Sequence, residues 1–155
     1  MKLTDYLTLK NIQIGVHAKE KTAIIRDLLK TASAVAPDLD LEEAFTGILH
    51  RENIGSTGIG KGVAIPHAGV KNCRRILPVI AISHEGLDYD SLDGKPVNIV
   101  FLILYPEDQV STQLKFLARV SRLLRNERLR ESLAKSSSAG EVIGILTQYE
   151  AEHFT

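Results

Sequence analysis

The chain has 155 residues, of which 44% are hydrophobic and 25% are charged, and its 19 basic and 19 acidic side chains cancel. This composition is typical of one soluble globular domain and excludes disordered, collagen-like and coiled-coil chains. The balanced charge gives no general attraction to nucleic acid or to an anionic membrane, and the apolar runs are too short to span a bilayer. We therefore expect a single domain over 1–155, ordered from about residue 5 to residue 150, that binds no nucleic acid and does not insert into a membrane.

The cellular compartment and the metal content follow from a few residue types. The opening residues lack the long apolar stretch of a secretory signal, and the single cysteine, Cys73, cannot form a disulfide within the chain. Both features are typical of a cytoplasmic protein. Four histidines show no paired metal-ligand spacing, so we expect neither a metal ion nor a cofactor; they are His17, His50, His84 and His153.

The first half of the chain predicts two helices. Apolar residues at helical spacing from about 19 to 35 indicate one helix, which Pro37 ends. Asp40 is suited to cap a second helix that begins at residue 41 and whose apolar face continues to Leu49. Four glycines between Gly55 and Gly62 then interrupt regular structure.

The second half predicts strands followed by helices. Strand-like runs cover 63–65, 77–83 and 97–104, and a tight turn at Asp93-Gly94 precedes the last of them. Helical spacing returns from Val110 to Leu124, and two further helices follow, one to about residue 135 and one over 139–150. This order predicts an α/β domain with a small mixed β-sheet sandwiched by helices.

Positive charge is concentrated in this helical part of the chain. Between Lys115 and Lys135 there are seven Lys or Arg residues and two Glu residues. Few aromatic side chains are interleaved with them, so a nucleic-acid face is not indicated. A solvated helix face, or a docking surface for an acidic partner, is the better interpretation.

The glycine-rich segment almost matches a nucleotide-binding P-loop. Gly55 is followed after four residues by Gly60-Lys61, but the next position is Gly62, where a P-loop needs Ser or Thr. A P-loop also follows a strand and opens a helix, and here a helix precedes the segment and a strand follows it. Nucleotide binding that depends on Lys61 is therefore a disfavoured alternative.

The same segment leads directly to a histidine. Clustered backbone N–H groups form anion-binding concavities, and a neutral imidazole is a good nucleophile near neutral pH. His67 follows Pro66, which favours extended backbone at Ile65. The combination predicts a phosphoryl group on or near His67; the alternative is a flexible loop beside a structural histidine.

The run from Arg51 to His67 resembles a known phosphoacceptor motif. Ser-Thr-Gly-Ile-Gly at 56–60 and Ala-Ile-Pro-His at 64–67 are similar to the fructose/mannitol-type IIA domains of the bacterial phosphoenolpyruvate-dependent phosphotransferase system, most of all to their solitary nitrogen-regulatory branch. The similarity extends over nearly the whole chain. It implies the IIA fructose/mannitol-type fold and a histidine phosphotransferase activity.

The resemblance also implies roles for particular residues. His67 accepts a phosphoryl group on Nε2 from the carrier protein HPr or its nitrogen-branch equivalent, while Nδ1–H donates to a backbone carbonyl. Backbone and hydroxyl donors at Ser56, Thr57 and Gly58 are expected to hold the phosphoryl oxygens. Arg51 is expected to pair with these oxygens or to hold the loop; the alternative is a surface residue at a helix end.

One position departs from the pattern of the family. Many relatives carry a second histidine at the start of the long helix, and this chain has Gln113 there. A glutamine amide can donate a hydrogen bond to phosphate but cannot become cationic. We therefore expect phosphorylation of His67 with weaker electrostatic help and a flatter response to pH.

Three functions remain open from the sequence. The first is a regulatory phosphocarrier of the nitrogen-regulatory type, whose phosphorylation state acts on target proteins. The second is the IIA component of a fructose- or mannitol-like sugar transporter, which passes the phosphoryl group to a IIB domain. The third is a noncatalytic binding module that has lost phosphotransfer, for which Gln113 is the only sign.

Overall fold

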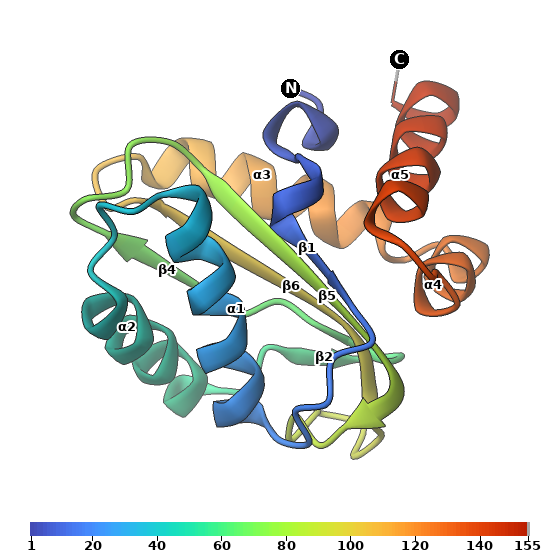
Figure 1. Cartoon of the computed structure of the whole chain (residues 1–155), viewed down its shortest axis with the longest axis horizontal. Coiled ribbons are helices and arrows are strands. Elements are labelled where there is room, and N and C mark those ends of the chain that lie inside the picture. Colours follow the sequence, from blue (N-terminus) through green and yellow to red (C-terminus); the bar gives the residue numbers. More distant parts are fainter. Residues whose placement is uncertain (155) are drawn as a thin grey trace.

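The fold is built on one mixed six-stranded β-sheet with helices on both faces (Figure 1). The computed structural model describes residues 1–154. The elements are η1 (Leu3–Tyr6), η2 (Leu9–Asn11), β1 (Ile12–Ile14), α1 (Lys21–Val35), α2 (Leu41–Ile54), β2 (Gly58–Gly60), β3 (Val63–Ala64), β4 (His67–Val70), β5 (Leu77–Leu87), β6 (Val97–Pro106), α3 (Val110–Leu123), α4 (Glu127–Ala134) and α5 (Ala139–His153). The predicted sandwich of helices around a small mixed sheet is confirmed.

The antiparallel pair β5 and β6 forms the centre of the sheet. The strand order is β1-β5-β6-β3-β2, and β4 also pairs with β6. β1 runs parallel to β5, while β3 and β4 run parallel to β6 one after the other along its other edge. Both central strands are buried almost throughout, which explains their nearly continuous apolar sequences.

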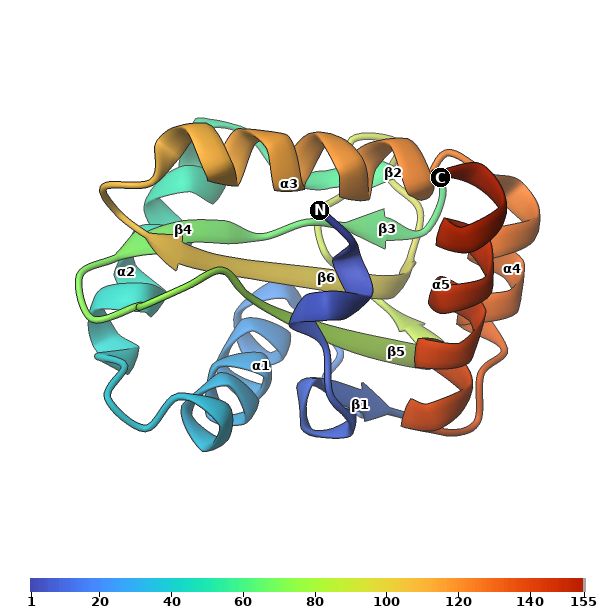
Figure 2. The same ribbon diagram turned by 90° about the horizontal axis from the view of Figure 1, so that it is seen from above.

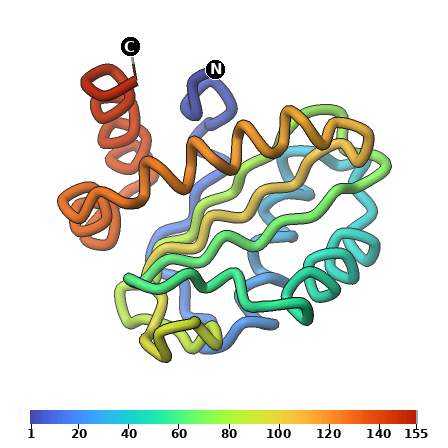
Figure 3. Tube along the Cα trace, turned by 180° about the vertical axis from the view of Figure 1, so that it is seen from behind, coloured from blue at the N-terminus to red at the C-terminus, as the bar shows by residue number. Residues whose placement is uncertain are grey.

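Alternating side chains on the central strands divide the core in two. Val79 and Ala81 point to one face, where they pack with the apolar residues of α1 and α2. Ile80 and Ile82 point to the other face, where they pack with η1, α3, α4 and α5. Figures 2 and 3 show α3 lying along this second face.

The predicted helices agree with the structure, and the short strands differ from the prediction. Asp40 caps α2 by accepting a hydrogen bond from the Glu43 N–H at 3.1 Å, as its position indicated. The segment predicted to lack regular structure contains β2, which pairs with β3 across a bulge. β1 and β4 were not predicted, because runs of three and four residues are too short for an alternating pattern to be recognised.

Several arginines of the basic segment have partners within the fold. Arg119 pairs with the buried Glu150, and Arg122 lies over the Phe154 ring. Arg130 donates to the backbone carbonyl groups of Leu124 and Arg125. Part of the local charge excess therefore serves the packing of α3, α4 and α5. Within residues 1–154, no helix combines the length and apolar character needed to cross a membrane.

Glu150 joins the two ends of the chain. Its carboxylate accepts hydrogen bonds from the Leu3 N–H at 2.8 Å, from the Thr4 N–H at 3.0 Å and from the Arg119 side chain at 2.8 Å. Burial alone would raise the pKa of this carboxyl, but these hydrogen bonds outweigh burial and lower the pKa below its ordinary value of 4.5.

We expect Glu150→Gln to lower the free energy of unfolding by about 2 kcal/mol at neutral pH, because it leaves buried donors without a charged acceptor. The folded-state pKa is lowered, so this stabilisation is complete above the ordinary pKa and is lost as the pH falls through the folded-state value. Urea unfolding of the wild type and of Glu150→Gln, at neutral pH and near pH 3, measures the difference between their free energies of unfolding. A difference that stays constant or grows in acid contradicts the assignment.

Candidate functional site

His67 lies at a break between two strands that share one partner. β3 pairs with β6 at Val63 opposite Ile99, and β4 begins with His67 opposite Ile103. Ile65 and Pro66 separate the two strands, and the Pro66 carbonyl accepts the Ile103 N–H at 2.9 Å. Among the strands of residues 1–154, β4 pairs only with β6. His67 therefore stands at an edge of the sheet and is partly exposed.

Strand alternation sets the face to which His67 points. Its neighbour Ala68 packs in the core formed with α1 and α2, whereas Ile65 and Ile103 pack in the core formed with α3. His67 therefore projects toward the face that α3 covers.

A backbone hydrogen bond orients the imidazole. His67 Nδ1 lies 2.8 Å from the carbonyl oxygen of Ile65. A carbonyl only accepts, so the proton is on Nδ1, and Nε2 of the neutral ring keeps its lone pair. This is the tautomer that the family resemblance implied.

The surroundings of His67 favour its neutral form. Burial is the largest cause that lowers its pKa, and the nearby Arg51 charge lowers it further. The hydrogen bond to Ile65 and the Glu52 charge act in the opposite direction. The net result is a pKa below the ordinary value of 6.5, which favours the uncharged ring at neutral pH.

Helix α2 approaches β4 closely at a glycine. A Cβ atom added to Gly47 would lie 3.2 Å from the Cβ of Ala68, so a larger residue there would push the helix from the strand. One turn further along α2, this approach places Arg51 and Glu52 near His67, and both charges act on its pKa. Arg51 Nη1 donates to the Gly55 carbonyl at 2.8 Å, so this arginine holds the start of the glycine-rich loop.

The loop after α2 is held by a buried carboxylate. Glu52 is 7% exposed and accepts the Thr57 N–H at 3.0 Å. The Thr57 hydroxyl also donates to Glu52, and Lys21 Nζ lies 3.0 Å from the same carboxylate. The phenol of Tyr89 lies 3.3 Å from the Thr57 hydroxyl, and burial together with the Glu52 charge raises the pKa of Tyr89 far above its ordinary value.

Because of these contacts, some of the backbone N–H groups that the sequence suggested as phosphoryl donors already have acceptors within the protein. The Thr57 N–H is bonded to Glu52, and the Gly58 N–H is bonded to Ser56 Oγ at 3.0 Å. Within residues 1–154, the N–H groups of Gly55 and Ser56 meet no protein acceptor. Of the four backbone N–H groups at 55–58, those of Gly55 and Ser56 are therefore the ones without a protein acceptor. Gly58 fills a steric role, since a Cβ atom there would come within 2.7 Å of Ser91 Oγ.

Lys61 does not occupy a P-loop. The segment follows helix α2 and continues into strand β3, which is the reverse of the order that a P-loop requires. Lys61 has φ 58°, and its N–H donates to an Asp93 carboxylate oxygen at 3.0 Å. The same carboxylate accepts the Lys95 N–H, so the turn at 93–95 fastens the glycine-rich loop.

Gln113 lies in the first turn of α3 and is 4% exposed. It shares the buried face of the helix with Phe116 and Val120, which pack against the sheet. Helix α3 covers the face of the sheet to which His67 points, so Gln113 lies on that face.

Sequence reasoning missed three residues near the site: Lys21, Glu52 and Tyr89. Glu52 stands inside the recognised motif, but an acidic residue near a helix end reads as solvent-exposed unless its buried partners are known. Lys21 and Tyr89 come from other parts of the chain. Within residues 1–154, no group of three or more His, Cys, Asp or Glu side chains is placed to hold a metal ion.

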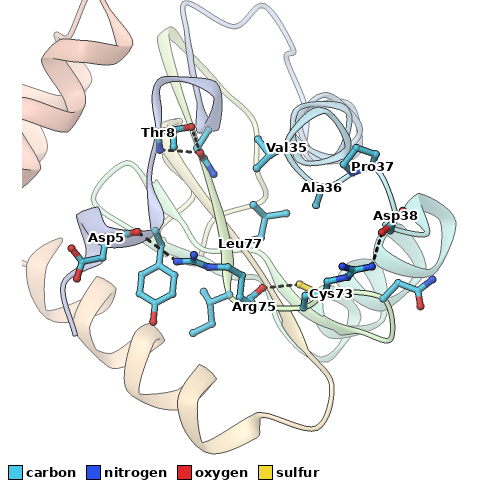
Figure 4. Close-up of a pocket in the computed structure, with 14 residues that line it drawn as sticks. Asp5, Thr8, Val35, Ala36, Pro37, Asp38, Cys73, Arg75 and Leu77 are labelled. Atoms are coloured by element: carbon cyan, nitrogen blue, oxygen red, sulfur yellow. Dashed lines mark hydrogen bonds and ion pairs between the residues drawn. The ribbon is translucent and has the colours of Figure 1, made fainter.

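A separate cavity of about 380 Å³ lies between the end of α1, the N-terminal segment and the loop before β5 (Figure 4). Val35 and Leu77 contribute apolar walls. Both of its arginines have partners within the fold, because Arg74 pairs with Asp38 and Arg75 lies over the Tyr6 ring. None of the predicted site residues lines it.

Comparison with known proteins identifies the family. The sequence model described as "Phosphoenolpyruvate-dependent sugar phosphotransferase system, EIIA 2" matches residues 5–149. The chain belongs to this family. The similarity that the Arg51–His67 motif indicated is therefore confirmed across nearly the whole chain.

The IIA domain has relatives in both branches of the family. It is 38% identical over 152 residues to the fructose-specific EIIABC component of Bacillus subtilis, covering 97% of this chain but only 24% of that relative. It is 32% identical over 146 residues to a nitrogen regulatory protein of Bradyrhizobium diazoefficiens, covering 94% of this chain and 95% of the relative.

Solved structures confirm the IIA fold. Nitrogen regulatory protein IIA-Ntr from Neisseria meningitidis superposes with a TM-score of 0.85 at 30% identity, over 93% of this chain and 98% of that one. Mannitol IIA from Escherichia coli superposes with a TM-score of 0.74 at 23% identity, over 90% and 98% of the two chains, which shows the shared fold.

We expect the imidazole of His67 to titrate below 6.5 in the unphosphorylated protein, because burial and Arg51 outweigh the groups that favour its charged form. The NMR shift of the ring Cε1 proton followed against pH measures this pKa, and the spectrum of His67→Ala assigns the resonance. A midpoint at or above the ordinary value contradicts the described environment.

Proposed function

We propose that this IIA domain is a phosphocarrier of the nitrogen-regulatory type, which accepts a phosphoryl group on His67 Nε2 from HPr or its nitrogen-branch equivalent. The observation that carries the proposal is the Nδ1–H hydrogen bond of a partly exposed His67 to the Ile65 carbonyl at 2.8 Å. This bond leaves Nε2 as the nucleophilic atom of a ring whose pKa is lowered.

The chemical step is an in-line transfer between two proteins. The Nε2 lone pair of His67 attacks phosphorus, the P–Nε2 bond forms, and the bond from phosphorus to the donor's leaving atom breaks. The Nδ1 proton stays on the ring, where the Ile65 carbonyl accepts its hydrogen bond and stabilises the positive charge that develops. No cofactor or metal ion takes part in the proposed step.

Charge and backbone donors assist the transfer. The N–H groups of Gly55 and Ser56 are free to donate to equatorial phosphoryl oxygens, and Arg51 supplies a cation close to the ring. The hydroxyls of Ser56 and Thr57 and the backbone at Gly58 shape this loop. Gln113 is proposed to donate its amide N–H to the phosphoryl group.

The proposed setting is the cytoplasm, where the phosphorylated and unphosphorylated forms act on different target proteins. A phosphoryl group adds nearly two negative charges and three acceptor oxygens to the edge of the sheet at His67. The chain covers 95% of the nitrogen regulatory protein of Bradyrhizobium diazoefficiens and 98% of IIA-Ntr from Neisseria meningitidis, which supports the regulatory role.

Incubation with phosphoenolpyruvate, enzyme I and HPr tests the phosphocarrier function. We expect intact mass to rise by one acid-labile phosphoryl group, and His67→Ala to show no rise, because the acceptor nitrogen is missing. His50→Ala removes an exposed histidine of α2 and is the matched control, which should be phosphorylated like the wild type. No gain by the wild type with either HPr type supports the noncatalytic binding module.

The second candidate is a component of a fructose transporter, favoured by the 38% identity to the fructose-specific EIIABC component. The same experiment separates the two roles once the phosphorylated protein is mixed with a fructose- or mannitol-specific IIB domain. Transfer to IIB at a rate that matches its loading by HPr supports transport, and a phosphoryl group that stays on His67 supports regulation.

We expect Gln113→His to increase the rate of phosphorylation about 10-fold below neutral pH and to steepen its pH profile. A histidine can become cationic beside the phosphoryl group, which the glutamine amide cannot. Initial rates measured across the pH range by intact mass, with the wild type alongside, provide the comparison. An unchanged rate and pH profile would remove Gln113 from the site.

A further inference from the structure

Glu52 is a buried charge that helix stability does not explain. It stands in the last turn of α2, where the helix dipole favours cations and disfavours anions. Burial of a carboxylate is also costly unless donors and a counter-charge surround it. Here both oxygens are used, since Thr57 donates with its N–H and its hydroxyl and Lys21 Nζ lies at 3.0 Å.

A chain of hydrogen bonds connects this carboxylate to the imidazole. The Thr57 N–H donates to Glu52, and the Thr57 carbonyl accepts the Ile65 N–H at 3.0 Å. The Ile65 carbonyl in turn accepts Nδ1–H of His67 at 2.8 Å. Thr57 and Ile65 each join two of these bonds, one through the N–H and one through the carbonyl of the same residue. The orientation of the ring therefore depends on the position of Thr57.

We propose that Glu52, held by Lys21, is a positioning residue for phosphoryl transfer: it fixes Thr57 so that Ile65 holds the His67 ring with Nδ1 protonated and Nε2 unprotonated. This role rests on the proposed function of His67 as the phosphoryl acceptor. Glu52 does not touch the phosphoryl group, because its oxygens are occupied by Thr57 and Lys21. It also fixes the end of the loop that carries the free N–H groups of Gly55 and Ser56.

Glu52→Gln is the sharpest test, because it keeps the shape of the side chain. Oε1 of Glu52 faces both the Thr57 N–H and Lys21 Nζ, and Oε2 faces the Thr57 hydroxyl. Glutamine loses the negative charge that pairs with Lys21, and its NH2 group replaces one of the two acceptor oxygens, so the Thr57 hydroxyl can no longer donate to it unless the contacts of Oε1 are given up. Without a firm hold on Thr57, we expect His67 to populate both neutral tautomers. Misplacement of the nucleophile should lower the phosphorylation rate about 10- to 100-fold.

The charged groups around His67 make a second readout possible. Arg51 and Glu52, both on α2, are the charges that act on the ring. β6 contributes the apolar Ile103 opposite His67, and α3 contributes the uncharged Gln113. Because the Glu52 charge raises the pKa of His67, Glu52→Gln is expected to lower that pKa further.

Long-range ¹⁵N NMR of the unphosphorylated protein reads the tautomer and the pKa of His67 without any phosphotransfer. Glu42→Gln is the matched control, since it neutralises an exposed carboxylate on the same helix that pairs with Arg26. We expect the wild type and Glu42→Gln to hold the Nδ1–H tautomer, and Glu52→Gln to lose it together with the phosphorylation rate. A wild-type tautomer, pKa and rate in Glu52→Gln overturn the proposal.

Thr57→Val keeps the proposal testable if Glu52→Gln fails to fold. It removes only the hydroxyl that donates to Glu52 and keeps the Thr57 backbone N–H and carbonyl. We expect a smaller change of the His67 tautomer in the same direction, and no change would overturn the proposal. A wild type that holds the Nδ1–H tautomer but takes no phosphoryl group would instead refute the phosphocarrier function and leave the role of Glu52 in orienting the ring intact.

Discussion

The break at Pro66 is the constraint on which the site depends. Residues before and after it pair with the same strand, β6, so the chain continues along the sheet while Ile65 and Pro66 lie outside both strands. That interruption frees the Ile65 carbonyl from the ladder and turns it toward the imidazole two residues later. Helix α2 then adds charge from the side, because Gly47 allows it to lie close to β4.

Local patterns predicted the parts of the molecule that local interactions determine. The helical periods, the Asp40 cap and the extended backbone before Pro66 all act over a few residues, and each was recognised in the sequence. The order of the strands was not predicted, because pairing joins residues far apart in the chain. β1 illustrates this, since its three residues become a strand only by pairing with β5.

The candidate site shows the same difference between features that depend on local sequence and features that depend on long-range contacts. His67 and the glycine-rich loop were predicted because their residues form one continuous motif in the sequence. The assignment of the loop's N–H groups was not, since Glu52 occupies the Thr57 donor and Ser56 occupies the Gly58 donor. The burial of Glu52 depends on Lys21, which lies 31 positions earlier in the sequence and is brought close by the packing of α1 against α2.

The hydrogen bonds from Leu3 and Thr4 to Glu150 bring the beginning of the chain against its last helix. Figure 1 shows the N-terminal turn and the end of α5 on the same side of the molecule. Adjacent ends make a domain easy to carry as a module inside a longer polypeptide, since a short linker closes the gap without disturbing the core.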